Sequence, residues 1–186
     1  VIDRARAAKV GFDKTVDITT GPVIDARAWT RLKGLVDDAV SEGATLLAGG
    51  DRPAGLNAGH YLAPTVLTDV TETMAVYREE TFGPIVSIVP FDTKTELLRM
   101  ANDCEEGGLT AYIFTRNLAR AEHYAASLRY GEIQINGVKY DINLPHGGIG
   151  QSGIGHDCSA LALHDYLVQK RITRALDTTT FGGLNP

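Results

Sequence analysis

A six-residue stretch, Glu79 to Pro84, combines two carboxylates, an aromatic ring and a Gly-Pro pair directly before an apolar run. The carboxylate of Glu80 could accept hydrogen bonds from two vicinal hydroxyls, and the face of Phe82 could stack on a flat ring. Residue types alone favour a simpler interpretation, because adjacent charges usually mark solvated surface. On that interpretation the stretch is an acidic turn that orients the following strand.

A second stretch, residues 145–157, gathers glycines around His146. A neutral imidazole offers one donor and one acceptor, so His146 could bind the polar end of a small ligand or simply bond a loop carbonyl. The literal spacing Gly148-x-Gly150-x-x-Gly153 does not indicate a dinucleotide fingerprint, because it does not begin at the end of a strand and lies near the end of the sequence. We interpret these glycines as positions where backbone passes close to a ligand or to another loop.

Cys158 has histidines nearby in sequence and is a candidate nucleophile, since a thiol at a helix start can be activated by histidine. A Cys-His hydrolase usually takes its histidine from a distant part of the chain, so we favour a small hydrophobic role for Cys158. Cys104 is a weaker candidate, and the two cysteines have neither disulfide-framework nor zinc spacing. Asp157, just ahead of a short predicted helix, is best explained by a salt bridge or by helix N-terminal charge.

The first half of the chain has recognisable helix and strand signals. Asp25 can cap a helix with one apolar face, and Gly43 follows as its stop. A short strand is predicted over residues 45–48, a loop over 49–59 and an extended segment over 61–70. Pro64 places that segment at a sheet edge or in irregular structure.

From Ile85 the pattern predicts a βαβαβ unit with strands 85–91, 110–114 and 132–136 and helices 93–103 and 118–129. Thr93 with Glu96 has capping-box spacing, Asn117 suits the next N-cap, and Gly131 suits the helix exit. Short apolar strands are typical of a parallel sheet covered on both faces, so we predict an α/β fold with a layered parallel sheet and flanking helices. Ligands in such sheets bind beyond the carboxyl ends of the strands, which places loop 137–155 on the functional rim.

The remaining residues predict a short helix over 159–164, a strand from Tyr166 to Leu176 and a polar tail. The chain has 186 residues, 44% of them hydrophobic and 22% charged, which is an ordinary globular mix. Its net charge of -5 is scattered and favours neither nucleic acid nor membrane as a partner. We expect a cytoplasmic, truncated chain, because the opening residues are neither a signal segment nor a Met start.

The sequence from Glu79 to Pro84 resembles the cofactor-contact motif of the aldehyde dehydrogenase superfamily. Residues 145–157 resemble that superfamily's C-terminal glycine-rich motif, Phe-Gly-Gly-x-Lys-x-Ser-Gly-x-Gly-Arg-Glu. The matching positions are Gly147, Gly148, Ser152, Gly153 and Gly155. The departures are His146 for Phe, Gly150 for Lys, His156 for Arg and Asp157 for Glu. A histidine at this place resembles the lactaldehyde and glycolaldehyde dehydrogenase branch.

The resemblance implies the C-terminal part of a catalytic domain over residues 1–165, with an oligomerisation strand and tail over 166–186. It implies that Glu80 holds the ribose beside the nicotinamide of NAD or NADP and that Phe82 packs against the nicotinamide ring. It also implies that His146 contacts a small hydroxyaldehyde, that Asp157 could relay protons, and that Tyr166 to Leu176 joins a neighbouring subunit in a homo-oligomer.

The reactive cysteine of the superfamily would precede Val1, so we predict that these residues alone are inactive. Two other classes stay open at this point. One is a non-catalytic binding or assembly module, and the other is a hydrolase that depends on Cys158.

Overall fold

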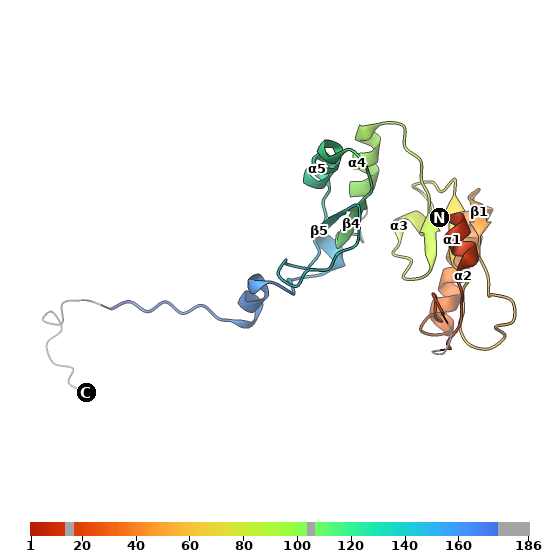
Figure 1. Ribbon diagram of the computed structural model, residues 1–186, viewed down its shortest axis with the longest axis horizontal. Helices are drawn as coiled ribbons and strands as arrows, with labels where there is room; N and C mark the ends of the chain where they lie inside the picture. Colours follow the sequence, from red (N-terminus) through yellow and green to blue (C-terminus); the bar gives the residue numbers. More distant parts are fainter. Residues whose placement is uncertain (14–16, 104–106, 175–186) are drawn as a thin grey trace, which may run out of the picture.

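The computed structural model describes residues 1–13, 17–103 and 107–174, which form two bodies and an extended arm (Figure 1). Cys104 lies outside the described residues. The first body contains α1 (Ile2–Ala7), α2 (Ala26–Ser41), β1 (Thr45–Ala48), β2 (Thr65–Thr68), α3 (Ala75–Arg78) and β3 (Ile85–Ser87). The second contains α4 (Lys94–Asn102), β4 (Thr110–Ile113), α5 (Leu118–Ser127) and β5 (Glu132–Ile135). Two 3-10 helices follow, η1 (Gly150–Ser152) and η2 (Ala160–Tyr166). The predicted α/β class is confirmed.

The first body is a three-stranded mixed sheet covered by α2. Strand β2 lies in the centre, antiparallel to β1 and parallel to β3. The Asp25 side chain accepts a 2.7 Å hydrogen bond from the Ala28 amide and so starts α2 as predicted. The apolar face of α2 packs against β2 in a core that also takes in Met74 and Val76 around α3. This core fixes the end of α3, and with it the position of the residues that follow.

Of the two alternatives predicted for Pro64, the structure has the irregular segment: Pro64 lies just outside β2, which begins one residue later and is a central strand with neighbours on both sides. The prediction for the following strand is wrong in detail. The strand predicted over 85–91 ends at Ser87, and Val86 is 47% exposed rather than buried on both faces. Among the described residues β3 pairs only with β2, and the exposure of Val86 shows that one of its faces is not covered, unlike a strand buried on both faces.

The second body is built on two parallel strands, β4 and β5, in register from Thr110 with Glu132 to Ile113 with Ile135. Helix α5 covers them through Ala121 and Tyr124. The expected single parallel sheet is therefore split in two, because β3 pairs with β2 and not with β4.

The two helix starts in this body are as predicted. Thr93 and Glu96 form both halves of the capping box of α4. Asn117 accepts a 2.9 Å hydrogen bond from the Arg120 amide at the start of α5.

Polar contacts from α4 join the second body to the first. The Arg99 guanidinium donates to both carboxylate oxygens of Glu72, at 2.7 and 2.5 Å. The Tyr77 hydroxyl donates to the Met100 carbonyl at 3.1 Å, and Arg78 pairs with Asp103 at 2.9 Å. The Arg99 hydrogen bond lowers the pKa of Glu72, which keeps this half-buried carboxylate ionised in the pair.

The arm begins with η2 and continues without regular structure through Arg174. The predicted strand from Tyr166 to Leu176 is therefore absent over its described part, and Leu176 and the tail lie outside the described residues. The backbone at Leu167 is extended, with φ −118° and ψ 144°. An extended segment becomes a strand only where a neighbour pairs with it. Within the described ranges, no helix is both long and apolar enough to cross a membrane.

Candidate functional site

The segment from Glu79 to Pro84 leaves α3 and is held against α2 by Arg31. The Arg31 guanidinium donates to the main-chain carbonyl of Glu80 at 3.3 Å and also to that of Thr81. The same guanidinium lies 4.0 Å from the Glu79 carboxylate. Three consecutive residues of the motif are thus fixed by one side chain of a capped helix.

Two backbone features shape this segment further. Phe82 has a φ of +49°, a left-handed conformation that costs a side-chain-bearing residue about 1–2 kcal/mol, and its ring is 81% exposed. A Cβ on Gly83 would lie 2.5 Å from a methyl carbon of Leu32, whose side chain is fully buried in the first body. Gly83 thus lies close against α2, while the neighbouring Phe82 ring is exposed to solvent. Glu80 is likewise exposed.

His146 sits at the start of the glycine-rich stretch and contacts Glu132 of β5. Its Nδ1 lies 3.1 Å from Oε2 of Glu132. Its main chain forms an antiparallel bridge with Asp157, with N to O distances of 2.9 and 2.8 Å. The Tyr140 ring meets the imidazole edge-on, with centroids 5.8 Å apart. Main chain, carboxylate and aromatic ring together fix the imidazole.

Glu132 is the most heavily bonded carboxylate of this region. Besides His146, it accepts hydrogen bonds from the Thr110 hydroxyl at 3.2 Å and from the Gln134 amide. Burial opposes ionisation, yet the hydrogen bonds from Gln134, His146 and Thr110 outweigh it and lower the pKa of Glu132. The side chain that faces His146 is thus an ionised acceptor.

A cavity of about 360 Å³ opens beside this pair. Residues from β5 and from the following loop line it, among them Glu132, Gln134, Lys139, Tyr140 and His146. The predicted substrate residue therefore faces a cavity of small-molecule size with polar walls.

The glycines of the loop allow its close packing on β5. A Cβ on Gly131 would collide with the Gly147 carbonyl, and one on Gly147 would come within 2.6 Å of the Gly155 carbonyl. The prediction that Gly131 serves as the helix exit is wrong, because α5 already ends at Ser127 with an extended Leu128. Gly131 is needed instead where the returning loop crosses the start of β5.

Cys158 and Asp157 continue this loop. The Cys158 sulfur lies 2.7 Å from the Tyr140 hydroxyl, and this hydrogen bond raises the pKa of Tyr140 to about 12. None of the described histidines bonds to that sulfur, so the geometry gives no support to a Cys-His hydrolase. Asp157 is exposed, and the N-cap of η2 is Ser159 rather than Asp157.

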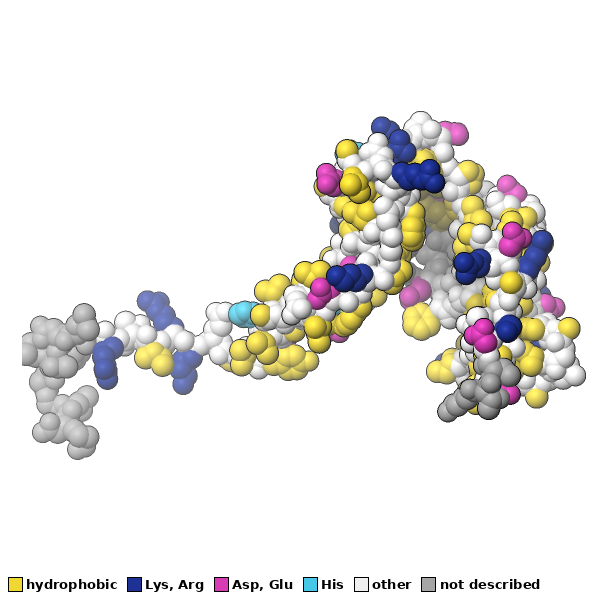
Figure 2. All heavy atoms as spheres, viewed as in Figure 1, with side chains coloured by type: hydrophobic (Ala, Val, Ile, Leu, Met, Phe, Trp, Pro, Cys, Tyr) yellow, Lys and Arg dark blue, Asp and Glu magenta, His cyan; other side chains and the backbone are white. Residues whose placement is uncertain are grey.

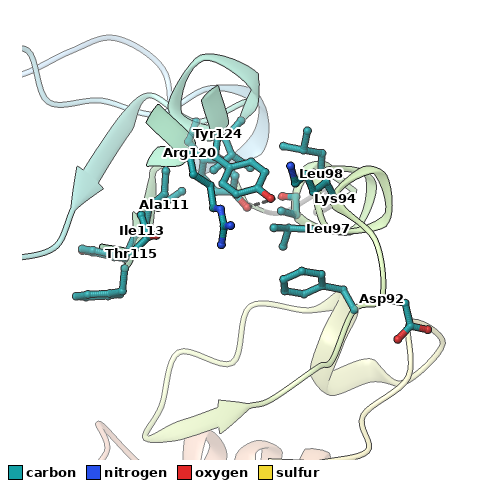
Figure 3. Close-up of a pocket in the computed structure, with 15 residues that line it drawn as sticks. Asp92, Lys94, Leu97, Leu98, Ala111, Ile113, Thr115, Arg120 and Tyr124 are labelled. Carbon is teal, nitrogen blue, oxygen red and sulfur yellow. Dashed lines mark hydrogen bonds between the residues drawn. The ribbon is translucent and has the colours of Figure 1, made fainter. Parts of the chain in front are cut away.

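A second cavity, of about 480 Å³, lies between α4, β4 and α5 (Figure 3). Leu97 and Leu98 of α4 form one side, and Arg120 and Tyr124 of α5 lie across from them. It contains none of the predicted site residues. In the part of the chain that the structure describes, no group of three or more histidines, cysteines or carboxylates could hold a metal ion.

Sequence reasoning missed Glu132, Tyr140 and Arg31. A signal for Glu132 existed, since Glu132 and Gln134 alternate with Ile133 and Ile135 and so share one face of the strand. The predicted cofactor residues lie ahead of β3 in the first body, whereas His146 lies beyond β5 in the second (Figure 1).

Comparison with known proteins gives a consistent result. Residues 1–172 match the model of the aldehyde dehydrogenase family. The chain is 34% identical over 163 residues to betaine aldehyde dehydrogenase of Atriplex hortensis, which covers 87% of the chain and 32% of that protein. It is 39% identical over 160 residues to glutarate-semialdehyde dehydrogenase of Pseudomonas putida, which covers 86% of the chain and 32% of that protein.

Solved structures agree with the sequences. The aldehyde dehydrogenase of Mycobacterium tuberculosis in complex with NAD+ superposes with a TM-score of 0.84 and 32% identity, over 88% of this chain and 34% of that one. Betaine aldehyde dehydrogenase of Staphylococcus aureus in complex with NAD+ has the same TM-score of 0.84 with 36% identity, over 98% and 37%. The chain thus spans about a third of the length of these relatives. By sequence and by fold, the chain belongs to the aldehyde dehydrogenase family.

Proposed function

We propose that this chain supplies the cofactor-contact and substrate-pocket residues of an NAD(P)-dependent aldehyde dehydrogenase that oxidises a small hydroxyaldehyde, such as lactaldehyde, to the acid. The family match over residues 1–172 carries the reaction class. The M. tuberculosis and S. aureus relatives were solved with NAD+, which supports a nicotinamide cofactor here.

The segment from Glu79 to Pro84 is the proposed cofactor contact. An exposed aromatic ring in a disfavoured backbone conformation is the kind of strain that functional sites retain, and Phe82 combines both properties. Its face would stack on the nicotinamide, and the Glu80 carboxylate would accept hydrogen bonds from the ribose hydroxyls. When bound, the nicotinamide supplies hydride acceptance. Arg31 positions both residues by holding the main chain between them.

The cavity beside His146 is the proposed substrate contact. The His146 imidazole would bind the hydroxyl next to the aldehyde group, and this contact would orient the carbonyl for oxidation.

The superfamily mechanism needs a cysteine thiolate to attack the aldehyde carbon. The Cys158 sulfur is instead in hydrogen-bond contact with the Tyr140 hydroxyl. We therefore propose that the 186-residue chain alone does not oxidise aldehydes. Formation of a homo-oligomer through the arm and a cytoplasmic location remain predictions from the sequence.

A chimera tests this function. The segment of the P. putida enzyme that aligns with this chain is replaced by this chain, and NADH formation is followed with lactaldehyde and with propanal, which lacks the hydroxyl. We expect turnover of lactaldehyde with the lower KM, and no NADH from the 186-residue chain by itself.

His146→Phe in the same chimera tests the hydroxyl contact, and propanal serves as the control substrate. It should raise the KM for lactaldehyde by about threefold to tenfold, the value of one hydrogen bond, and leave that for propanal nearly unchanged. Absence of turnover with every aldehyde in a folded chimera would contradict the proposed function.

A further inference from the structure

We infer that Glu132 holds His146 in the tautomer with its proton on Nδ1, so that Nε2 presents a hydrogen-bond acceptor to the cavity and selects aldehydes that carry a donor. The substrate part of this inference rests on the proposed function. The tautomer itself depends only on the contacts of the second body.

The chain of contacts starts at the main chain of Lys139. Its carbonyl accepts a 2.8 Å hydrogen bond from Nε2 of Gln134, and its amide donates to Oε1 of Gln134 at 3.1 Å. Because the Lys139 carbonyl can only accept and the Lys139 amide can only donate, these two contacts assign the nitrogen and the oxygen of the Gln134 side-chain amide. The amide nitrogen, a donor only, is therefore the atom that reaches Glu132.

Glu132 can only accept in this arrangement. Its Oε1 receives the Gln134 amide, and its Oε2 receives the Thr110 hydroxyl and faces Nδ1 of His146. An ionised carboxylate has no proton to give, and the lowered pKa of Glu132 is consistent with that state. The hydrogen bond at 3.1 Å must then be donated by Nδ1.

A neutral imidazole with its proton on Nδ1 has an unprotonated Nε2. The described residues provide no partner for Nε2, while the His146 side chain is 32% exposed and lines the cavity. The edge-on Tyr140 ring and the bridge to Asp157 restrict reorientation of the imidazole. A ligand in the cavity therefore meets an acceptor.

An acceptor at Nε2 of His146 favours substrates that carry a hydrogen-bond donor near the aldehyde group. A hydroxyl or a primary ammonium group donates to Nε2, whereas a carboxylate or a quaternary ammonium has no hydrogen to offer. Hydroxyaldehydes and primary aminoaldehydes are thus preferred over the carboxylated and quaternary aldehydes that several relatives are named for.

Nitrogen NMR of the chain tests the tautomer directly. In 15N-labelled protein at neutral pH, we expect the Nδ1 of His146 to resonate as a protonated ring nitrogen and Nε2 as an unprotonated one. His146→Gln assigns the signals by their loss. Either the opposite pattern or two protonated ring nitrogens in the unsubstituted chain would overturn the inference.

Two substitutions test whether Glu132 sets the tautomer of His146. Glu132→Gln places an amide that can donate to Nδ1 and should move the proton to Nε2. Thr110→Val removes another donor to Glu132 but leaves the His146 contact, so its tautomer pattern should stay that of the unsubstituted chain. An unchanged pattern in Glu132→Gln would also overturn the inference.

The chimera separates this inference from the proposed function. Glu132→Gln should raise the KM for lactaldehyde by about threefold to tenfold while that for propanal changes little. A chimera that is inactive with all aldehydes, together with the expected NMR pattern, would contradict the function and leave the tautomer standing. An active chimera without preference for donor-bearing aldehydes would overturn the selection.

Discussion

Single residues of the proposed cofactor contact, Glu79 to Pro84, are held by residues that lie outside it. Arg31 bonds to two successive carbonyls there, and Leu32 of the same helix fills the space that a Cβ on Gly83 would need. The exposed Phe82 ring is thus positioned by packing in the first body. Resemblance to a motif identified the segment, while only the structure shows why residue 83 must be glycine.

Gly83→Ala should lower stability by about 1–3 kcal/mol, because the new methyl group would overlap the Leu32 side chain, which is fully buried. The free energy of unfolding from urea titration measures this loss.

Gly34→Ala is the matched control for Gly83→Ala. A Cβ there meets nothing within 4 Å, in the middle of α2, so this change should stabilise the chain by up to about 1 kcal/mol. Equal effects of the two substitutions would contradict the packing argument.

At the scale of elements, helix caps were predictable and strand partners were not. The capping box of α4 and the Asn117 cap of α5 depend on residues a few positions apart, so local sequence specifies them. The pairing of β3 with β2 and the contact of Glu132 with His146 join residues that are distant in sequence, and local patterns do not encode them. Resemblance to the family identified His146, whereas its contact with Glu132 is visible only in the structure.

The α4 cap offers a direct measurement. Thr93→Ala removes the hydroxyl that accepts from the Glu96 amide at 3.1 Å and should cost about 0.5–2 kcal/mol of stability in urea unfolding. Thr93→Ser keeps the hydroxyl and should cost much less. A similar loss in both variants would assign the effect to the methyl group instead of the cap.

At the scale of the whole molecule, the arm is the part whose apolar side chains are least buried by the rest of the described chain. Hydrophobic side chains gather along it (Figure 2). The exposed ones are Leu161, Leu163, Tyr166, Leu167, Val168 and Ile172. Monomeric proteins rarely leave large groups of apolar side chains in water. An extended apolar segment is suited to pairing with a strand of a second copy, as the sequence predicts.

Sedimentation velocity tests this assembly. The purified chain should self-associate, and Val168→Glu should shift it toward monomer, because Val168 is 98% exposed and a charge there cannot be buried against a second copy without cost. Ile24→Glu places the same charge at a 91% exposed position ahead of α2 and should leave the mass unchanged. Identical masses for all three proteins would contradict pairing through the arm.

Lys139 takes part in orienting the Gln134 amide through its main chain alone. Its side chain is therefore replaceable: any amino acid except proline, which lacks the amide hydrogen, can serve at position 139. Because Lys139 also lines the cavity, substitutions there would change the charge of the cavity wall while the protonation pattern of the imidazole is preserved. Ligand preference in the proposed substrate cavity can thus change through position 139 while the contacts of Gln134, Glu132 and His146 are kept.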